Sequence, residues 1–287
     1  MNHFVNKDSP IVIGGVGGSG TRVVAQMMSE AGVYIGDLLN EPNDNLWFTL
    51  LFRRPWLLND ENEKQQLKLS EIFRKRMFNE KISFSEKLKV RIAEFEFVSK
   101  KYIRSKDWYS LPNKISKSLR SFSSTDSEKK YWGWKEPNSH IYISLLAKKF
   151  PEMKFLLVMR NGLDMAFSSN QIQLRNFGNH FGLKGNSPAD SLEYWIRANT
   201  KAIDTGKKLL GENFKLLRLE DLCASPEKET RELLKWSGIE FNEEMIRKLS
   251  ALPKFPSSLN RYQKENLNIF SSSQLKSVTA FGYQIHQ

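Results

Sequence analysis

The stretch that decides the fold is Pro10–Arg22, PIVIGGVGGSGTR. A short apolar run, Ile11–Ile13, precedes five glycines within the seven residues of Gly14–Gly20. We expect a helix over Thr21–Ala31 directly afterwards. Glycine permits positive φ and lets a ligand approach the backbone closely, and the N-terminus of a helix attracts anions. The stretch therefore predicts a strand, a tight glycine turn and a helix that together hold a phosphate or phosphosulfate group.

The turn alone leaves several functions open. Ser19 and Thr21 add hydroxyl donors to it, and Arg22 adds a fixed positive charge. Gly15–Gly20 fits both the G-x-G-x-x-G dinucleotide fingerprint and the glycine spacing of a Walker loop. However, Thr21-Arg22 replaces the Lys-Ser/Thr pair that would hold the β- and γ-phosphates and magnesium. A nucleotide kinase, a nicotinamide-dependent oxidoreductase with Asp37 on the ribose and a non-catalytic anion-binding module remain alternatives at this point.

The composition is that of a globular intracellular protein. The 287 residues are 40% hydrophobic, include 19 Phe and carry a single cysteine, Cys223. No apolar run approaches the roughly 20 residues that a membrane-spanning helix needs, and the first residues lack the pattern of a signal peptide. The four histidines are scattered and show no metal-ligand spacing. We expect one domain over residues 1–287, located in the cytoplasm, with no metal.

The positive charge is concentrated in one part of the chain. The formal net charge is +12, and +8 of it lies between Glu61 and Arg120. Over residues 46–125 apolar residues recur at helical spacing between lysines and glutamates, which predicts a basic helical insertion. The balance favours an anionic ligand or acceptor. Nucleic acid is the other partner that such a charge suggests, but the chain has none of the usual nucleic-acid-binding motifs.

The remaining segments alternate between strand and helix patterns. Lys154–Met159 is a nearly continuous apolar run, as in a buried parallel strand. Further strands are expected at Gly32–Ile35, Tyr131–Lys135 and Phe214–Leu219, and helices at Ser139–Phe150, Leu163–Gln173, Pro188–Leu210 and Glu243–Ser250. We expect Asp221–Pro226 to form a turn that leads into another helix ending at Trp236. We expect Pro253–Gln287 to be largely irregular. The order predicts a three-layer, P-loop-like α/β fold, with a parallel sheet flanked by helices.

Four segments together resemble the sulfotransferases that use 3′-phosphoadenosine 5′-phosphosulfate (PAPS). They are similar to bacterial sulfotransferases and to the tyrosylprotein-sulfotransferase branch. The segments are Gly18–Thr21, Gly133–Pro137 (GWKEP), Arg160–Asp164 (RNGLD) with Ser168, and Leu219–Leu222 (LEDL) with Pro226. The resemblance spans about residues 10–36 and 132–238 and does not cover the helical insertion. It implies transfer of a sulfuryl group to a hydroxyl or amine of an acceptor such as a glycan, lipid, peptide or small molecule.

The resemblance also implies how the donor is held. Gly17, Gly18, Ser19, Gly20 and Thr21 would hold the 5′-phosphosulfate end. Arg160 and Ser168 match the family's arginine–serine spacing for the 3′-phosphate, and Arg261 in the C-terminal tail would add a second cation there. Many family members carry a basic residue before the Ser-Gly-Thr turn, where this chain has Gly17-Gly18. Arg22 and Lys135 would then have to supply the missing positive charge.

The chemistry of the transfer suggests two catalytic side chains. Charge develops on the leaving bridge oxygen in such reactions, and Lys135, at the end of a predicted strand, is the candidate to stabilise it. The acceptor needs a base within reach. Glu41 is the first choice, because the base glutamate of the tyrosylprotein branch follows the loop at a similar distance. Asp37 and His140 are the substitutes.

Overall fold

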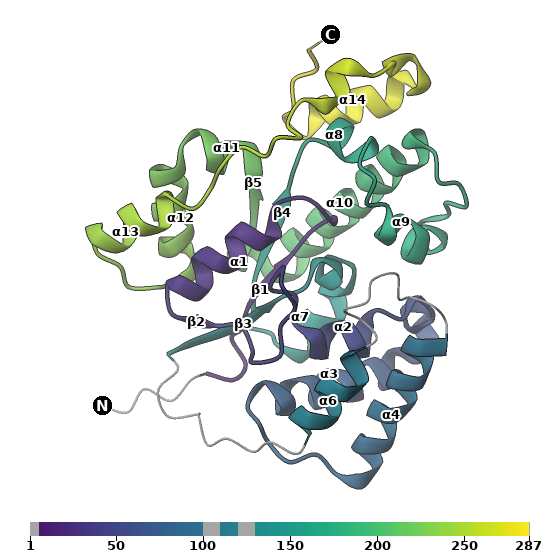
Figure 1. The fold of residues 1–287 in the computed structure, drawn as a ribbon, viewed down its shortest axis with the longest axis vertical. Helices are drawn as coiled ribbons and strands as arrows, with labels where there is room; N and C mark the ends of the chain where they lie inside the picture. The colour runs from purple at the N-terminus through teal and green to yellow at the C-terminus, as the bar shows by residue number, and fades with distance from the viewer. Residues whose placement is uncertain (1–5, 100–109, 120–129, 287) are drawn as a thin grey trace.

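The protein is built on a five-stranded parallel sheet (Figure 1). The computed structural model describes residues 6–99, 110–119 and 130–286. The strands are β1 (Ile11–Gly14), β2 (Val33–Tyr34), β3 (Tyr131–Lys135), β4 (Lys154–Met159) and β5 (Phe214–Arg218), in the spatial order β2-β3-β1-β4-β5. Because all neighbours are parallel, the carboxyl ends of the strands meet along one edge, where open α/β sheets bind ligands.

The opening strand occupies the centre of this sheet. β1 lies between β3 and β4, and Ile13 is in register with Lys135 on one side and with Leu156 on the other. All four residues of β1 are buried. The glycine turn that follows β1 therefore emerges between the ends of β3 and β4.

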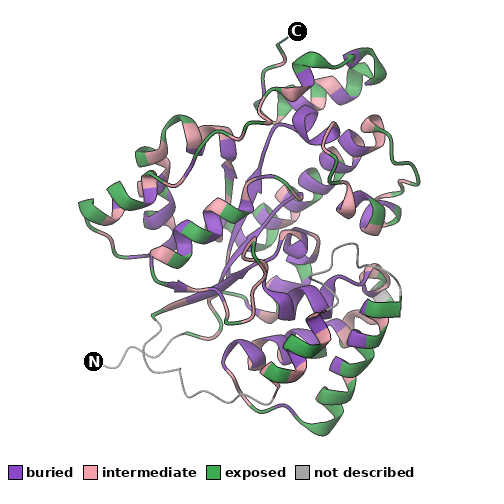
Figure 2. Cartoon of the chain, viewed as in Figure 1, coloured by how far each residue is buried: buried purple, intermediate pink, exposed green. Residues whose placement is uncertain are grey.

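Helices cover both faces of the sheet and complete the predicted three layers. On one face α1 (Thr21–Glu30), α12 (Pro226–Ser237) and α13 (Glu243–Ser250) pack with Ile11 and Ile13. On the other face α7 (Ile143–Lys149) and α10 (Pro188–Leu210) pack with Val12 and Leu157. The buried residues follow the sheet through the middle of the molecule in Figure 2.

The basic segment forms helices that pack on the second face. They are α2 (Leu46–Phe52), α3 (Glu63–Met77), α4 (Phe84–Ser99) and α6 (Leu111–Ser118). Phe48 and Phe73 lie against Trp134 of β3. Their ring centroids are 5.6 and 4.8 Å, respectively, from the Trp134 ring centroid. These helices thus share one apolar core with the sheet. Parts of the predicted 46–125 insertion, residues 100–109 and 120–125, lie outside the described residues.

One predicted helix is in fact two. Instead of a single helix over Leu163–Gln173, the chain forms α8 (Gly162–Ala166) and α9 (Ile172–Phe177). The Ser168 hydroxyl accepts a hydrogen bond from the Asn170 backbone N–H, and the Asn170 side chain accepts one from Ile172 N–H. Such side chains compete with helical backbone bonds. The Gln171 amide also donates to carbonyls at the end of α8.

The C-terminal stretch is more regular than the sequence predicts. Upstream of it, Leu219–Ala224 forms α11, where a turn over Asp221–Pro226 is expected. Within Pro253–Gln287, α14 (Ser272–Ala280) begins with a capping box between Ser271 and Gln274. This serine–glutamine pair is a local signal for the start of a helix. Within the ranges given above, no helix is long and apolar enough to cross a bilayer.

Candidate functional site

The glycine turn is shaped by close contacts with its neighbours. A Cβ at Gly15 would lie 2.3 Å from the backbone oxygen of Val158 in β4. Gly20, the residue before α1, is left-handed (φ 93°), and a Cβ there would lie 2.7 Å from the Leu219 side chain. Any other residue at these positions would collide or be strained. The turn is therefore held between β4 and α11, and within it the backbone N–H groups of Gly15 and Ser19 donate to the Pro137 and Val16 oxygens.

Several features of the turn suit an anion. No side chain caps the N-terminus of α1, so its first N–H groups have no side-chain acceptor there. The Ser19 hydroxyl is buried and has no hydrogen-bond partner. The backbone N–H of Gly17 donates to the side-chain oxygen of Gln173 in α9, at 2.8 Å. A neutral amide oxygen thus occupies a position where a ligand oxygen could bind.

The connection after β4 lies beside the turn. A Cβ at Gly18 would lie 3.2 Å from the Met165 side chain of α8. Arg160 ends β4, and its Nη2 donates to Asp164 of α8 at 3.0 Å and to the Ser258 backbone oxygen at 2.6 Å. Its Nε is buried without a partner. The arginine is therefore engaged by the protein through Nη2 alone and keeps other donors for a ligand.

Arg261, the second cation predicted to bind the 3′-phosphate, shares a hydrogen-bond acceptor with Arg160. Arg261 Nε donates to the same Ser258 backbone oxygen at 3.3 Å. The Asp164 carboxylate accepts from the backbone N–H of Asn260, which holds the C-terminal segment against α8. Ser168 follows the end of α8 and is half-buried, with its hydroxyl bonded to Asn170 N–H. The structure thus brings Arg160 and Arg261 together, although they are 101 positions apart in the sequence.

Lys135 is buried at the end of β3. Its register partner Ile13 packs with α1, so the lysine leaves the sheet on the α1 side. Its Nζ donates to the Pro42 backbone oxygen at 2.9 Å and forms an ion pair with Asp44. Asp44 is in turn tied to Asn40 by a side-chain bond of 2.8 Å. The Asn40–Asp44 turn therefore lies directly over the end of β3.

The predicted base Glu41 lies on the outer side of this turn. It forms a bidentate ion pair with Arg22 at 3.1 and 3.0 Å, and both side chains are more than half exposed. Asp37 is also exposed and contacts Asn79 at 3.5 Å. His140 is buried, and its Nδ1 is hydrogen-bonded to the Pro137 backbone oxygen at 2.7 Å. Burial lowers its pKa to about 4. It is therefore neutral at physiological pH.

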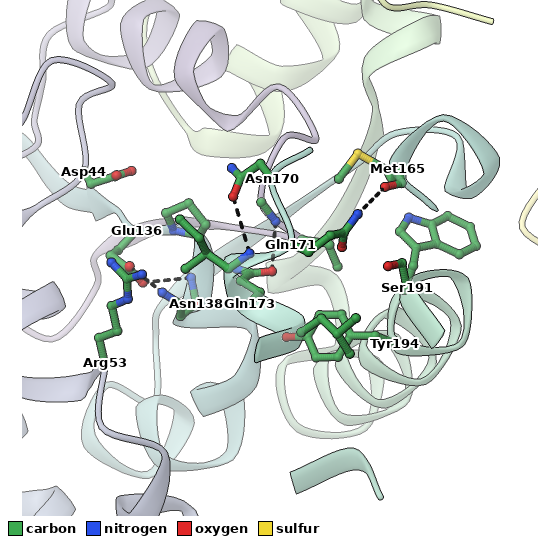
Figure 3. Close-up of a pocket in the computed structure, with 16 residues that line it drawn as sticks. Asp44, Arg53, Glu136, Asn138, Met165, Asn170, Gln171, Gln173, Ser191 and Tyr194 are labelled. Atoms are coloured by element: carbon green, nitrogen blue, oxygen red, sulfur yellow. Dashed lines mark hydrogen bonds between the residues drawn. The ribbon is translucent and has the colours of Figure 1, made fainter. Parts of the chain in front are cut away.

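A cleft opens beside the turn and contains a different set of polar groups (Figure 3). Gly17 of the turn lines it together with the polar side chains of Asp44, Arg53, Glu136, Asn138, Asn170, Gln171, Gln173, Ser191 and Tyr194. Apolar contacts come from Val16, Met165, Ile172, Leu174 and Trp195. The cleft thus joins the end of the glycine turn to the end of β3.

Glu136 is the most perturbed acid in the cleft. Its carboxylate accepts two bonds from Asn138, from the backbone N–H at 2.7 Å and from Nδ2 at 2.6 Å. Burial, with the nearby negative charge of Asp44, raises its pKa to about 7, while Arg53 opposes this shift. Burial also lowers the pKa of Arg53. Glu136 can therefore exchange a proton near neutral pH.

Two further groups in the cleft have unmet hydrogen-bonding capacity. Asn138 Oδ1 and the Tyr194 hydroxyl are both buried and have no partner. Burial raises the pKa of Tyr194, so its phenol stays protonated. Buried polar groups are normally satisfied, and these two face a cleft that a ligand could fill.

Sequence reasoning missed Asp44, Arg53 and Gln173, and gave Glu136 no role of its own. Glu136 lies within the GWKEP segment, so the sequence offered a local signal for a catalytic role. Each of the others meets its partner only after folding: Gln173 is 156 positions from Gly17, and Asp44 is 91 from Lys135. In the part of the chain that the structure describes, no group of three or more potential ligands could hold a metal ion.

Comparison with known proteins gives a consistent result. Residues 10–243 match the family model described as "Sulfotransferase family". No curated protein sequence matches the chain. Three similar solved structures show the same fold at low identity. Sulfotransferase STF9 from Mycobacterium avium is 13% identical, with a TM-score of 0.52, over 96% of this chain and 77% of the other.

The other two are described as sulfotransferase domains. The domain from the curacin biosynthetic pathway is 12% identical, with a TM-score of 0.53, over 97% of this chain and 99% of the other. The domain from the olefin synthase of Synechococcus PCC 7002 is 14% identical, with a TM-score of 0.51, over 97% and 96%.

Proposed function

The chain belongs to the sulfotransferase family, and we propose that its acceptor binds in the cleft between the glycine turn and Glu136. The family's donor is PAPS, which supplies an activated sulfuryl group. The observation that carries the proposal is that Gly17 of the turn and two carboxylates, Asp44 and Glu136, line one cleft. A donor held by the turn would present its reactive end where an acceptor could lose a proton.

The residues of the turn fit the 5′ end of this donor. The uncapped N-terminus of α1, the unpartnered Ser19 hydroxyl and the Gly17 N–H can all donate to anionic oxygens. Thr21, Gly18 and Gly20 complete the same turn. We assign the 3′-phosphate to Arg160 and Arg261, which converge on the Ser258 oxygen. Ser168 joins them in this assignment, through its place in the family spacing.

Lys135 and Glu136 would share the chemistry of the transfer. The acceptor oxygen forms a bond to sulfur as the bond from sulfur to the leaving oxygen breaks. The Lys135 ammonium would stabilise the negative charge on that leaving oxygen. Asp44 and the Pro42 carbonyl hold the ammonium at the end of β3. Arg22, although paired with Glu41, adds positive charge in the first turn of α1.

Glu136 is our candidate to receive the acceptor proton. It lines the cleft and has a pKa of about 7, near the value that favours a general base at neutral pH. Glu41, the base predicted from spacing, faces Arg22 on the surface instead. Asp44 lines the cleft but is occupied by Lys135 and Asn40. The three carboxylates can be separated by experiment.

The cleft favours an uncharged acceptor rich in hydroxyl groups, such as a neutral glycan. Its acidic groups, Asp44 and Glu136, offset the positive charge of Arg53. Asn138 Oδ1 requires a hydrogen-bond donor and the Tyr194 hydroxyl can donate or accept. Hydroxyl groups of a sugar meet both requirements. An anionic acceptor would have to approach Asp44 without a matching cluster of cations.

The test is transfer of radiolabelled sulfate from PAPS to neutral and anionic glycans, lipids and peptides, followed by variants on the best acceptor. Glu136→Gln should lower kcat by about 10²–10⁴, the usual contribution of a general base. Glu41→Gln, the matched control on the surface, should leave kcat nearly unchanged. A large loss in Glu41→Gln with normal activity in Glu136→Gln would return the role to Glu41. Transfer confined to anionic acceptors would contradict the assigned acceptor class.

A further inference from the structure

Helix α4 exposes a regular apolar stripe on its outer side. Its members are Phe84, Leu88, Ile92, Phe95 and Val98, with exposed fractions between 45 and 86%. The spacings of four, four, three and three residues place all five side chains on one face of an α-helix. In Figures 1 and 2, α4 lies on the outer side of the helical block, away from the sheet, with much of its surface exposed.

This stripe does not serve the protein's own core. The opposite face of α4 already packs inward through Val90, Ala93 and Phe97, all of which are fully buried. Single exposed apolar residues are common on protein surfaces, whereas a contiguous patch marks an interaction site. Among the residues that the structure describes, the helix therefore has one apolar face packed on the core and a second apolar face that is exposed.

Positive charge borders the stripe on both sides. At 100° per residue, Lys87 lies at one edge of the stripe and Arg91 lies within it, between Phe84 and Val98. Lys89 lies beyond the other edge, past Glu96. Lys89 and Ile92 also line a surface hollow with Lys64, Lys68 and one acid, Glu61. The acidic side chains of α4 are engaged by the protein itself: Glu86 pairs with Lys75, Glu94 with Arg91 and Glu96 with Arg54.

We propose that α4 docks this protein on the surface of an anionic membrane. Apolar side chains flanked by lysine and arginine are the features of a helix that lies in the interface of a bilayer, with its apolar face among the acyl chains and its cations near anionic headgroups. The charge complementarity selects this occupant over a second copy of the chain, whose own α4 would bring the same positive border into contact. The proposal is independent of the acceptor and of the assigned base.

Vesicle sedimentation tests the proposal with the full chain. The protein should sediment with phosphatidylcholine vesicles that contain phosphatidylserine, and bind at least about tenfold more weakly to phosphatidylcholine alone. Added salt should weaken the binding, because the electrostatic attraction is screened. The double variant Phe84→Ser/Phe95→Ser should lose at least about tenfold in vesicle affinity, since two large side chains leave the interface.

A matched control removes two exposed apolar side chains elsewhere. Phe255 and Ile269, 51 and 44% exposed, lie in the C-terminal segment, and Phe255→Ser/Ile269→Ser should bind vesicles like the wild type. Thermal unfolding checks that all variants fold. The proposal is overturned if the wild type does not bind anionic vesicles, or if the α4 variant binds them with the same affinity as the wild type. It is also overturned if light scattering shows a dimer that the α4 variant abolishes while vesicles are not bound.

Discussion

Replacing Gln173 by alanine should make the protein bind its donor more tightly. The Gln173 side chain accepts the Gly17 N–H at 2.8 Å and donates to the Gly15 oxygen at 3.4 Å. Only the first bond has good geometry. If a donor oxygen needs the same N–H, binding must first displace the glutamine. The variant removes this competitor.

The size of the effect follows from one hydrogen bond. A neutral bond of this kind contributes about 1 kcal/mol net, which corresponds to a gain of about fivefold in affinity. Gln173→Glu keeps an acceptor for Gly17 but adds negative charge beside the donor, so it should weaken binding by about tenfold or more. Titration calorimetry with 3′-phosphoadenosine 5′-phosphate and with PAPS measures both variants. Gln26→Ala, on the exposed side of α1, is the control and should bind like the wild type.

Weaker binding by Gln173→Ala would refute this reasoning. It would mean that the glutamine organises the turn for the donor instead of competing with it. Unchanged affinity in both Gln173 variants would place the donor away from Gly17.

Three further changes have definite expected outcomes. Lys135→Ala should lower kcat for sulfate transfer by about 10²–10³, the effect of losing one stabilising donor; near-normal turnover would exclude its role at the leaving oxygen. For Glu136, the pKa of about 7 in the folded state lies above the ordinary value of 4.5, so between these pH values the folded state holds a proton that the unfolded state has lost. The free energy of unfolding should therefore fall by about 3 kcal/mol as the pH rises through that interval. Chemical denaturation between these pH values should show this loss in the wild type and a flatter profile in Glu136→Gln; equal slopes would mean that the carboxyl is not perturbed. Gly133→Ala should destabilise the fold by about 3 kcal/mol or prevent folding, because its Cβ would lie 1.8 Å from the Ile11 oxygen in β1; a melting temperature equal to that of the wild type would contradict the close approach of the two strands.

The elements that the sequence predicts well are those with a local signal. Ile11–Ile13 and Lys154–Met159 are short apolar runs bounded by turn residues, and both became buried strands of the sheet. Arg160 follows such a run directly, so its place at the ligand edge could be read from the chain. The long amphipathic pattern of Pro188–Leu210 likewise matched one helix.

Much of what the sequence could not predict depends on distant contacts, and one miss, the break between α8 and α9, depends on local bonds. Nothing near Gln173 indicates that its amide will meet Gly17 from another helix. Glu41 and Asp44 belong to the same acidic turn, and only the folded turn shows that Asp44 faces Lys135 while Glu41 faces Arg22. The break between α8 and α9 arises from serine and asparagine side chains that bond to nearby backbone N–H groups. Their effect on a helix depends on such local competition, which residue spacing does not reveal.

The central claim is that the glycine turn and Arg160 hold the two ends of one nucleotide. Titration calorimetry without magnesium should compare 3′-phosphoadenosine 5′-phosphate with adenosine 5′-phosphosulfate, which lacks the 3′-phosphate, in the wild type and in Arg160→Ala. We predict that the variant loses about 10- to 150-fold in affinity for the first nucleotide, as expected for a charge-assisted bond of about 1.5–3 kcal/mol, and little for the second. Equal losses for both nucleotides, or no loss for either, would contradict the account.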